Sequence, residues 1–137
     1  MANRIRRVDY FKTMVPNRTG QGARALGKLK AAGVNLLAVL AFPSGGRAQF
    51  DLVPEDAAAL RRAARKAGLQ LGPRKTVFLI EGSDRIGVIA AVLQKLAKAR
   101  INVRATAAAR AGGGRYGGLL WVKPRDVGRT ARALGAK

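Results

Sequence analysis

The chain has 137 residues, of which 48% are hydrophobic, 5% aromatic and 25% charged, a composition typical of a globular protein with one or two small domains. Its 27 Lys and Arg residues exceed its 7 Asp and Glu residues, so the net charge of +20 predicts attraction to polyanions without naming a partner. The chain contains no Cys and no His, which excludes disulfides, thiolate or imidazole metal ligands, cysteine nucleophiles and histidine bases.

The sequence also lacks the features that direct a chain to membranes. No run approaches the ~18 apolar residues that a bilayer crossing requires. The basic N-terminus is not followed by the apolar segment of a secretory signal. We therefore expect a cytoplasmic protein with no membrane association.

The chain contains an internal repeat, which predicts two units, residues 1–72 and residues 73–137. Two blocks recur at an offset of 67 residues and a third at an offset of 70, so three residues are inserted in the second copy. The Gly-rich stretch Ala111–Gly118 is the natural place for that insertion. The matched blocks are Asn17–Gly20 with Asp84–Gly87, Val34–Leu36 with Ile101–Val103, and Val53–Asp56 with Lys123–Asp126.

The first copy reads as strand, helix, strand, strand, helix. Apolar residues at helical spacing alternate with strand-like runs, and Pro and Gly separate these segments. Pro54 suits the first position of the second helix. The expected elements are a strand Tyr10–Val15, a helix Gly20–Ala32, strands Val34–Phe42 and Arg47–Val53, a helix from Pro54 to Gly68, and a short strand Leu69–Leu71.

The second copy repeats this order but ends before its closing strand. Both copies predict an α+β protein of two tandem ferredoxin-like βαββαβ units, with antiparallel sheets and the helices on one face. The uncovered sheet face and the open edge left by the missing strand favour a homodimer or higher oligomer. The expected elements are a strand Thr76–Glu81, a helix Asp84–Ala99, strands Ile101–Ala109 and Leu119–Lys123, and a helix Pro124–Leu134.

Two matching turns are candidate binding loops. Each lies between the end of a strand and the start of a helix, where free backbone N–H groups and the helix dipole attract anions. An ordinary helix-capping turn is the alternative interpretation. The candidate ligand-binding residues in these turns are Asn17, Arg18 and Gly20, and Asp84, Arg85 and Gly87.

Asn35 and Asn102 form a second matching pair. Each is a lone polar residue just inside a predicted buried strand, where an amide requires a hydrogen-bonding partner. That partner could be a neighbouring helix end. Alternatively, the amide could bind the ammonium and carboxylate of a free amino acid beside the helix N-terminus.

The segments Asn17–Gly20 and Val34–Leu36, joined by a helix with spaced Leu residues, resemble the ACT domain. The second copy is similar, so the resemblance covers about residues 6–134. It implies a stand-alone tandem ACT protein that binds an amino acid and acts through oligomerisation or on an unidentified regulated protein. It also implies ligand contacts from Asn17, Gly20 and Asn35, and from Asp84, Gly87 and Asn102. Because Asp84 is an acceptor-only carboxylate where the first copy has Asn17, the two sites are not equivalent.

Nucleic-acid binding is the competing interpretation. The same topology serves RNA recognition, and the Gly/Arg-rich stretch resembles tracts that contact single strands, although a flexible hairpin loop is the simpler interpretation. The sheet offers no paired aromatic platform, because Phe50 stands alone on its strand face. The candidate polyanion contacts are Arg61, Arg62, Arg65, Lys66, Arg110 and Arg115.

An enzyme is the least favoured class. Seven carboxylates without His or Cys leave no pair of catalytic groups at a spacing that brings them together. No Gly-rich nucleotide-binding motif follows a strand. We therefore expect no catalytic activity and no cofactor.

Overall fold

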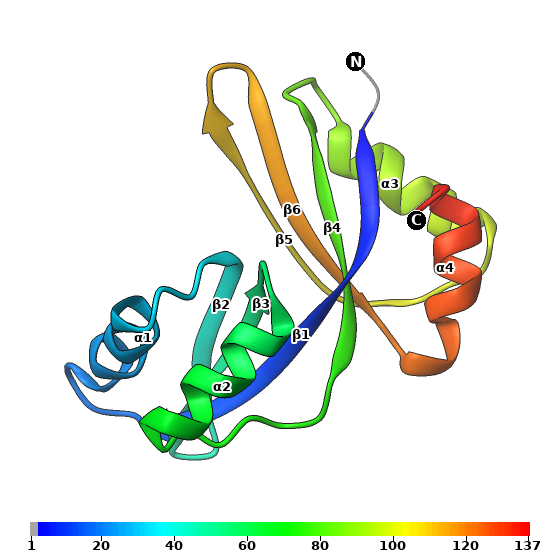
Figure 1. Cartoon of the computed structure of the whole chain (residues 1–137). Coiled ribbons are helices and arrows are strands. Elements are labelled where there is room, and N and C mark those ends of the chain that lie inside the picture. Colours follow the sequence, from blue (N-terminus) through cyan, green and yellow to red (C-terminus); the bar gives the residue numbers. More distant parts are fainter. Residues whose placement is uncertain (1–2) are drawn as a thin grey trace. The chain divides into compact units, whose positions relative to one another are not determined.

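The computed structural model describes residues 3–137, and Figure 1 shows its six strands and four α-helices. The contacts within the chain divide it into two units. Unit N is Asp9–Lys75, and unit C consists of the described residues up to Val8 together with Thr76–Lys137. None of the helices in residues 3–137 has the length and apolar character that a membrane-spanning segment requires.

In unit N, two helices cover one face of a three-stranded sheet. Strand β3 lies between β1 and β2 and is antiparallel to both. Phe11 and Leu52 are paired across β1 and β3 and pack with Leu29 and Leu60 of the helices. The elements are β1 (Arg4–Pro16), of which residues 9–16 belong to this unit, α1 (Gln21–Ala31), β2 (Leu36–Ser44), β3 (Arg47–Pro54) and α2 (Ala57–Ala67).

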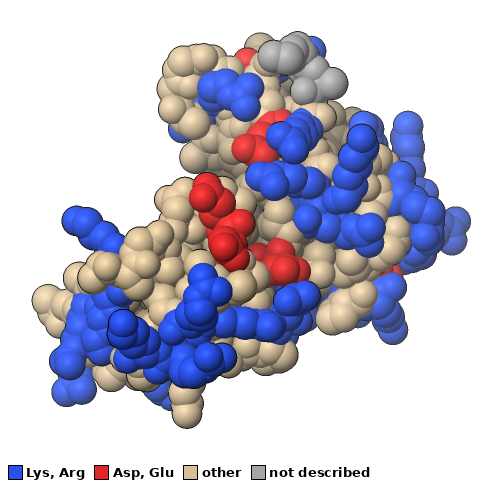
Figure 2. Space-filling view, viewed as in Figure 1, with Lys and Arg blue, Asp and Glu red and all other residues tan. Residues whose placement is uncertain are grey.

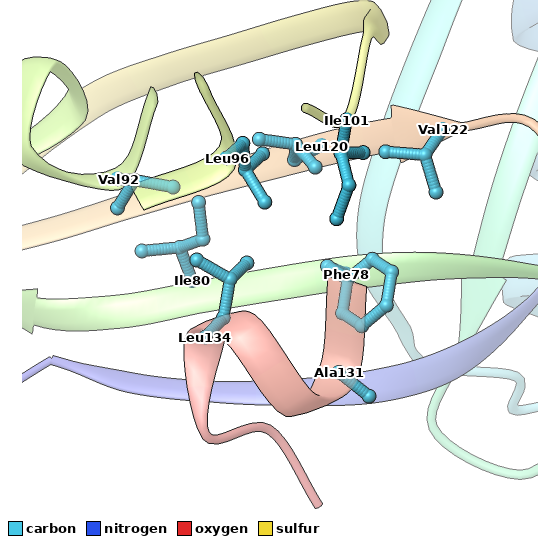
Figure 3. Packing of buried hydrophobic residues seen from close by; sticks show 9 residues of the cluster. All are labelled: Phe78, Ile80, Val92, Leu96, Ile101, Leu120, Val122, Ala131 and Leu134. Carbon is cyan, nitrogen blue, oxygen red and sulfur yellow. The ribbon is translucent and has the colours of Figure 1, made fainter. Parts of the chain in front are cut away.

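Unit C has the same order of elements. Strand β6 lies between β4 and β5 and is antiparallel to both. Figure 3 shows how Phe78 and Ile80 of β4 and Leu120 of β6 face Leu96 and Leu134 of the two helices. The elements are β4 (Lys75–Ser83), α3 (Val88–Lys98), β5 (Val103–Gly112), β6 (Arg115–Val122), the short 3-10 helix η1 (Pro124–Asp126) and α4 (Val127–Leu134).

The N-terminal part of β1 occupies the edge of unit C that the sequence predicted to be open. β1 is the neighbour of β4 in the sheet, and the residues up to Val8 belong to unit C. Arg6 pairs with Glu81 of β4 at 3.4 Å, and the backbone N–H of Arg7 donates to the carbonyl of Lys137 at 3.0 Å. No strand follows α4 among the described residues, but the expected open edge is wrong, because an earlier part of the chain fills it.

This packing groups the residues before Asp9 with the second half of the sequence. The repeat had placed them in the first predicted domain, residues 1–72. The boundary between residues 72 and 73, as a boundary between two domains that fold separately, stays a prediction.

The sheet of unit C has one face turned away from its helices. Because side chains alternate along a strand, Val77 and Leu79 point away from the helices that cover Phe78. The expected covering of this face by a second copy of the chain stays a prediction.

Several predicted boundaries differ from the structure. Pro54 is the last residue of β3 rather than the first of α2, because Asp56 begins that helix: its carboxylate accepts from the N–H groups of Ala58 at 3.0 Å and Ala59 at 3.2 Å. Helix α3 begins at Val88, four residues later than predicted, and β1 begins six residues earlier.

The predicted short strand Leu69–Leu71 is not a strand. This segment nevertheless lies beside β1. The Thr13 hydroxyl donates to the carbonyl of Gln70 at 2.9 Å, and the N–H of Gly72 donates to the carbonyl of Lys12 at 2.8 Å.

The Gly-rich stretch Ala111–Gly118 forms a hairpin, as predicted, and the turn of this hairpin is tight. Gly113 and Gly114 form its turn with φ of +56° and +72°, the left-handed conformation that two-residue hairpin turns need. The other six residues of the stretch belong to β5 and β6. A side chain at Gly118 would press on the Ala107 carbonyl at 3.2 Å, so this glycine also permits close packing of the two strands.

Deleting residues 1–8 should destabilise unit C selectively. Strand β4 would lose a hydrogen-bonded neighbour. Since each hydrogen bond contributes about 1 kcal/mol, the free energy of unfolding of unit C should fall by at least about 2 kcal/mol. Hydrogen exchange of the β4 amides should accelerate, while the amides that join β2 to β3 serve as the internal control. Unchanged protection of β4 would contradict the assigned role of the N-terminal segment.

Candidate functional site

The loop after β1 leads into a helix that has no side-chain cap, although the N–H of Gln21 donates to the carbonyl of Arg18 at 3.2 Å. Gly20 is the N-cap residue of α1, with φ of +86° and no side-chain hydrogen bond to the helix, and the first turn contains no acidic residue. The first N–H groups of a helix have no acceptor within the helix itself. Asn17, Arg18 and Gly20 are all exposed beside this helix end.

Unit C repeats this arrangement after β4. Gly87 is the N-cap of α3, with φ of +77°, no side-chain cap and no acid in the first turn. Helix α2 differs, since the Asp56 carboxylate already occupies its N-terminal N–H groups. Helices α1 and α3 thus share an N-terminus that is open to an anion, in the places where the sequence repeats.

The two loops differ in charge. The Asp84 carboxylate pairs with the guanidinium of Arg110 at 2.8 Å, and the N–H of Asp84 donates to the carbonyl of Gly114 at 2.9 Å. The β5–β6 hairpin therefore both anchors this loop and neutralises its carboxylate. Arg110 was predicted to contact polyanions. No local sequence pattern indicates its pairing with Asp84, because the two residues are 26 positions apart and meet only through the hairpin.

Ile86 is the other distinctive residue of the loop in unit C. It is fully exposed, with a relative accessibility of 106%. The corresponding position of unit N is the polar Thr19. The two loops therefore offer different surfaces to a ligand.

Asn35 and Asn102 are exposed, so the prediction that they are buried is wrong. Each lies just before its strand rather than inside it, because β2 begins at Leu36 and β5 at Val103. The side-chain amide of Asn35 donates to the Glu55 carboxylate at 3.2 Å, and the main-chain carbonyl of Asn35 accepts from the Glu55 N–H at 3.0 Å. Glu55 is a partner that the sequence interpretation did not include.

The register of unit N places Asn35 far from the loop that contains Asn17. Pro16 at the end of β1 is opposite Arg47, whereas Leu36 at the start of β2 is opposite Pro54 at the other end of β3. The seven residue steps between Arg47 and Pro54 correspond to about 23 Å of strand. One small ligand cannot contact both Asn17 and Asn35 of a single unit N.

The same separation holds in unit C. Ser83 is opposite Arg115 at one end of β6, and Val103 is opposite Val122 at the other end. The structure therefore brings together Asp84, Arg85 and Gly87 in one loop but leaves Asn102 at the far end of the sheet.

The remaining candidate cations divide between a helix and the hairpin. Arg61, Arg62, Arg65 and Lys66 all lie on the exposed side of α2, while Arg115 is exposed on the hairpin. The Arg61 guanidinium carbon lies 5.1 Å from the centre of the Phe11 ring, a cation–π distance. Phe50 packs beneath α1, where a side chain at Gly22 would collide with its ring at 2.7 Å, so Phe50 is not a stacking platform.

Within residues 3–137, no three acidic side chains come together as a metal site would require. The arrangement offers backbone N–H donors and cations, a chemistry that suits the binding of anions.

No protein-family model matches the sequence, and no curated protein matches it. Solved structures do match. A protein of Bacteroides thetaiotaomicron superposes with a TM-score of 0.81 and 14% identity, over 96% of this chain and 88% of that one. The ligand-free regulatory subunit of aspartate kinase from Thermus thermophilus gives 0.59 and 16%, over 98% and 93%.

The allosteric aspartate kinase of Clostridium acetobutylicum is also similar, with a TM-score of 0.58 and 12% identity, over 95% of this chain and 33% of the enzyme. The chain has an ACT-like fold. At these identities the likeness concerns the fold, and this ACT-like chain must be assigned a function from its own residues.

Replacing Gly20 by Ala should destabilise the protein by about 1–2 kcal/mol. A side chain at this position meets no atom within 4 Å, so the cost comes from its positive φ alone. Gly27→Ala within α1 is the matched control. It also meets open space, and it should stabilise the helix by about 0.5–1 kcal/mol. Chemical denaturation measures both, and equal effects would contradict the assigned loop conformation.

Proposed function

We propose that the chain is a non-catalytic regulatory protein that binds an amino acid and acts through self-association or on a second protein. The ACT-like fold that it shares with regulatory subunits of aspartate kinase supports this proposal. The observation that carries it is the pair of helix N-termini, α1 and α3, that follow matching loops and lack a side-chain cap. The chain would then belong to the tandem ACT proteins, with one such loop in each unit.

The loop of unit N is the better candidate for the carboxylate of the ligand. The first N–H groups of α1 and the positive end of its dipole favour a carboxylate there, and Arg18 adds a positive charge. The loop contains no acidic residue. In unit C the Asp84 carboxylate and its partner Arg110 stand beside the corresponding helix end, so we expect that site to be weaker for anions.

An oligomer would complete the site in unit N. Asn35 of the same unit is too far away, but antiparallel pairing of two β2 strands would bring Asn35 of the partner subunit to the end where Ser44 lies. Ser44 is opposite Arg47, which is opposite Pro16 at the start of the loop. The ligand carboxylate would then bind the helix end, while an amide from the second copy accepts from its ammonium.

Strand β2 has the properties of an edge that pairs with a second copy. It is the last strand on its side of unit N, and its nine residues include no charge. Leu37, Val39 and Phe42 remain exposed by 36%, 42% and 40%. An uncharged apolar edge strand readily pairs with another chain. Charged side chains on an edge strand normally prevent such pairing, and β2 has none.

A thermal-shift screen against the twenty amino acids tests ligand binding. An amino acid at one hundred times its Kd should stabilise the protein by about 2.7 kcal/mol, which corresponds to a rise in melting temperature on the order of 5–10 °C. Asn17→Ala should weaken the binding of that amino acid at least tenfold by calorimetry. Gln94→Ala, an exposed amide on α3, is the matched control and should have no effect.

The absence of a shift with any amino acid would contradict the proposed function. A shift that survives both Asn17→Ala and substitution of Gly20 would contradict the placement of the site in this loop.

Val39→Lys should dissociate the proposed oligomer. A lysine near the middle of β2 would lie close to the same lysine of the second copy, and its charge would be costly to desolvate. Light scattering coupled to size exclusion should show the wild-type protein as a dimer or larger and the variant as a monomer. Ala105→Lys on β5, the edge strand of unit C, is the matched control. A wild-type monomer would contradict assembly through β2.

A further inference from the structure

The charges of the chain are segregated between its helices and the rest of the fold. The four α-helices contain eleven Lys and Arg residues, three in α1, four in α2, two in α3 and two in α4, but no Asp or Glu. Solvent-exposed helices ordinarily mix both signs, because opposite charges one turn apart stabilise the helix.

The seven carboxylates lie in strands, in loops and in the 3-10 helix η1, and each is already engaged. Four pair with arginines, those of Asp9, Glu81, Asp84 and Asp126. The Asp56 carboxylate caps α2. The carboxylates of Asp51 and Glu55 accept from side-chain amides at 3.0 Å and 3.2 Å. Asp126 pairs with Arg129 of α4 at 3.0 Å, whereas the other three ion pairs involve arginines that lie outside the helices.

Seven of the eleven helix cations lie on α1 and α2, the two adjoining helices of unit N. Lys28 of α1 reaches α2, where its ammonium donates to the carbonyl of Ala67 at 3.2 Å. None of these cations forms an ion pair with a carboxylate among residues 3–137. Figure 2 shows Lys and Arg gathered over α1 and α2. We call this group the α1–α2 basic surface, formed by the exposed residues Arg24, Lys28, Arg61, Arg62, Arg65 and Lys66.

We propose that the α1–α2 basic surface binds the phosphodiester backbone of a nucleic acid without reading its sequence. Arg61 and Arg65 are one helical turn apart, and so are Arg62 and Lys66. They form two rows along α2, and within each row the two residues are about 6 Å apart. One guanidinium group can donate two parallel hydrogen bonds to two oxygens of the same phosphate. Arg61 is held in place over the Phe11 ring, which lowers the entropy it loses on binding.

Protein partners and membranes fit this surface less well. Protein interfaces depend on buried apolar and aromatic residues, and peripheral membrane helices insert apolar anchors. The exposed large hydrophobic residues among the described residues lie in β2 and in the loop of unit C, not in α1 or α2. Between the cations, Ala58 and the α1 residues Ala23 and Gly27 are exposed and small, so a sugar–phosphate backbone can approach closely.

This surface differs from the nucleic-acid site that the sequence had indicated. The Gly/Arg-rich stretch is a tight hairpin, and its Arg110 is engaged by Asp84. Phe50 lies beneath α1 and cannot stack on bases. Binding by phosphate contacts alone predicts similar affinities for unrelated sequences and a steep dependence on salt.

Fluorescence anisotropy with a labelled 20-base-pair duplex and the corresponding single strand, at 50, 100 and 200 mM salt, tests this proposal with the full chain. The variant R61Q/R62Q/R65Q/K66Q should bind at least tenfold more weakly at 100 mM salt. The slope of log K against log salt should fall by about 2–4. The matched control K95Q/K98Q/R125Q/R132Q removes the same charge from exposed positions of unit C and should change affinity less than threefold.

Three outcomes would overturn the proposal: no binding at 50 mM salt, equal losses in the two variants, or binding to vesicles containing phosphatidylserine in preference to either nucleic acid. Equal losses would assign the attraction to net charge rather than to this surface. Circular dichroism should show unchanged helix content, since Gln is a good helix former. Amino-acid binding at the loop of unit N should persist in both variants, so each function is tested independently.

Discussion

The fold depends on one hydrogen-bonding requirement at β4. The backbone groups on the side of β4 away from β6 need partners, because unpaired N–H and carbonyl groups are costly when buried. No strand follows α4 among the described residues, and the beginning of β1 lies beside β4 instead. The thirteen-residue β1 therefore serves both units, with the part up to Val8 in unit C and the remainder in unit N.

This sharing of one strand affects the interpretation of the repeat. An incomplete second copy at first implied an open edge and a dimer that would cover it. The structure satisfies that edge within the chain. The argument for self-association consequently moves to β2, where an uncharged edge strand with exposed Val39 and Phe42 remains.

The distribution of charge separates two potential functions in space. Each of the loops after β1 and β4 leads to a helix N-terminus without a side-chain cap and has only a few polar or charged side chains. This chemistry suits a small anion such as an amino-acid carboxylate. The α1–α2 basic surface extends over two helices, consists of cations and small residues, and has no large apolar side chain exposed. These properties suit the binding of a polyanionic backbone. Because none of the ion pairs among the described residues involves a cation of α1 or α2, this surface keeps its positive charge.

Local patterns in the sequence were sufficient for the elements and for the two loops. Apolar spacing predicted α1 to within one residue of Gln21–Ala31, since a helix face is set by residues three and four apart. The repeat located both loops because their glycines recur at the same place. The same reasoning failed for Asn35. A continuous apolar run indicated a buried strand, yet β2 lies at an edge, and position in a sheet is decided by segments distant in sequence.

The sequence by itself therefore determined the order of strands and helices, the repeat and the excess of positive charge, because these depend on composition and on neighbours a few residues apart. Only the tertiary structure decided which strand completes unit C, that Asp84 pairs with Arg110, and that Asn17 and Asn35 lie at opposite ends of one sheet. Each of these depends on which segments pair across the sheet. Strand pairing joins residues whose separation in the sequence carries no local signal.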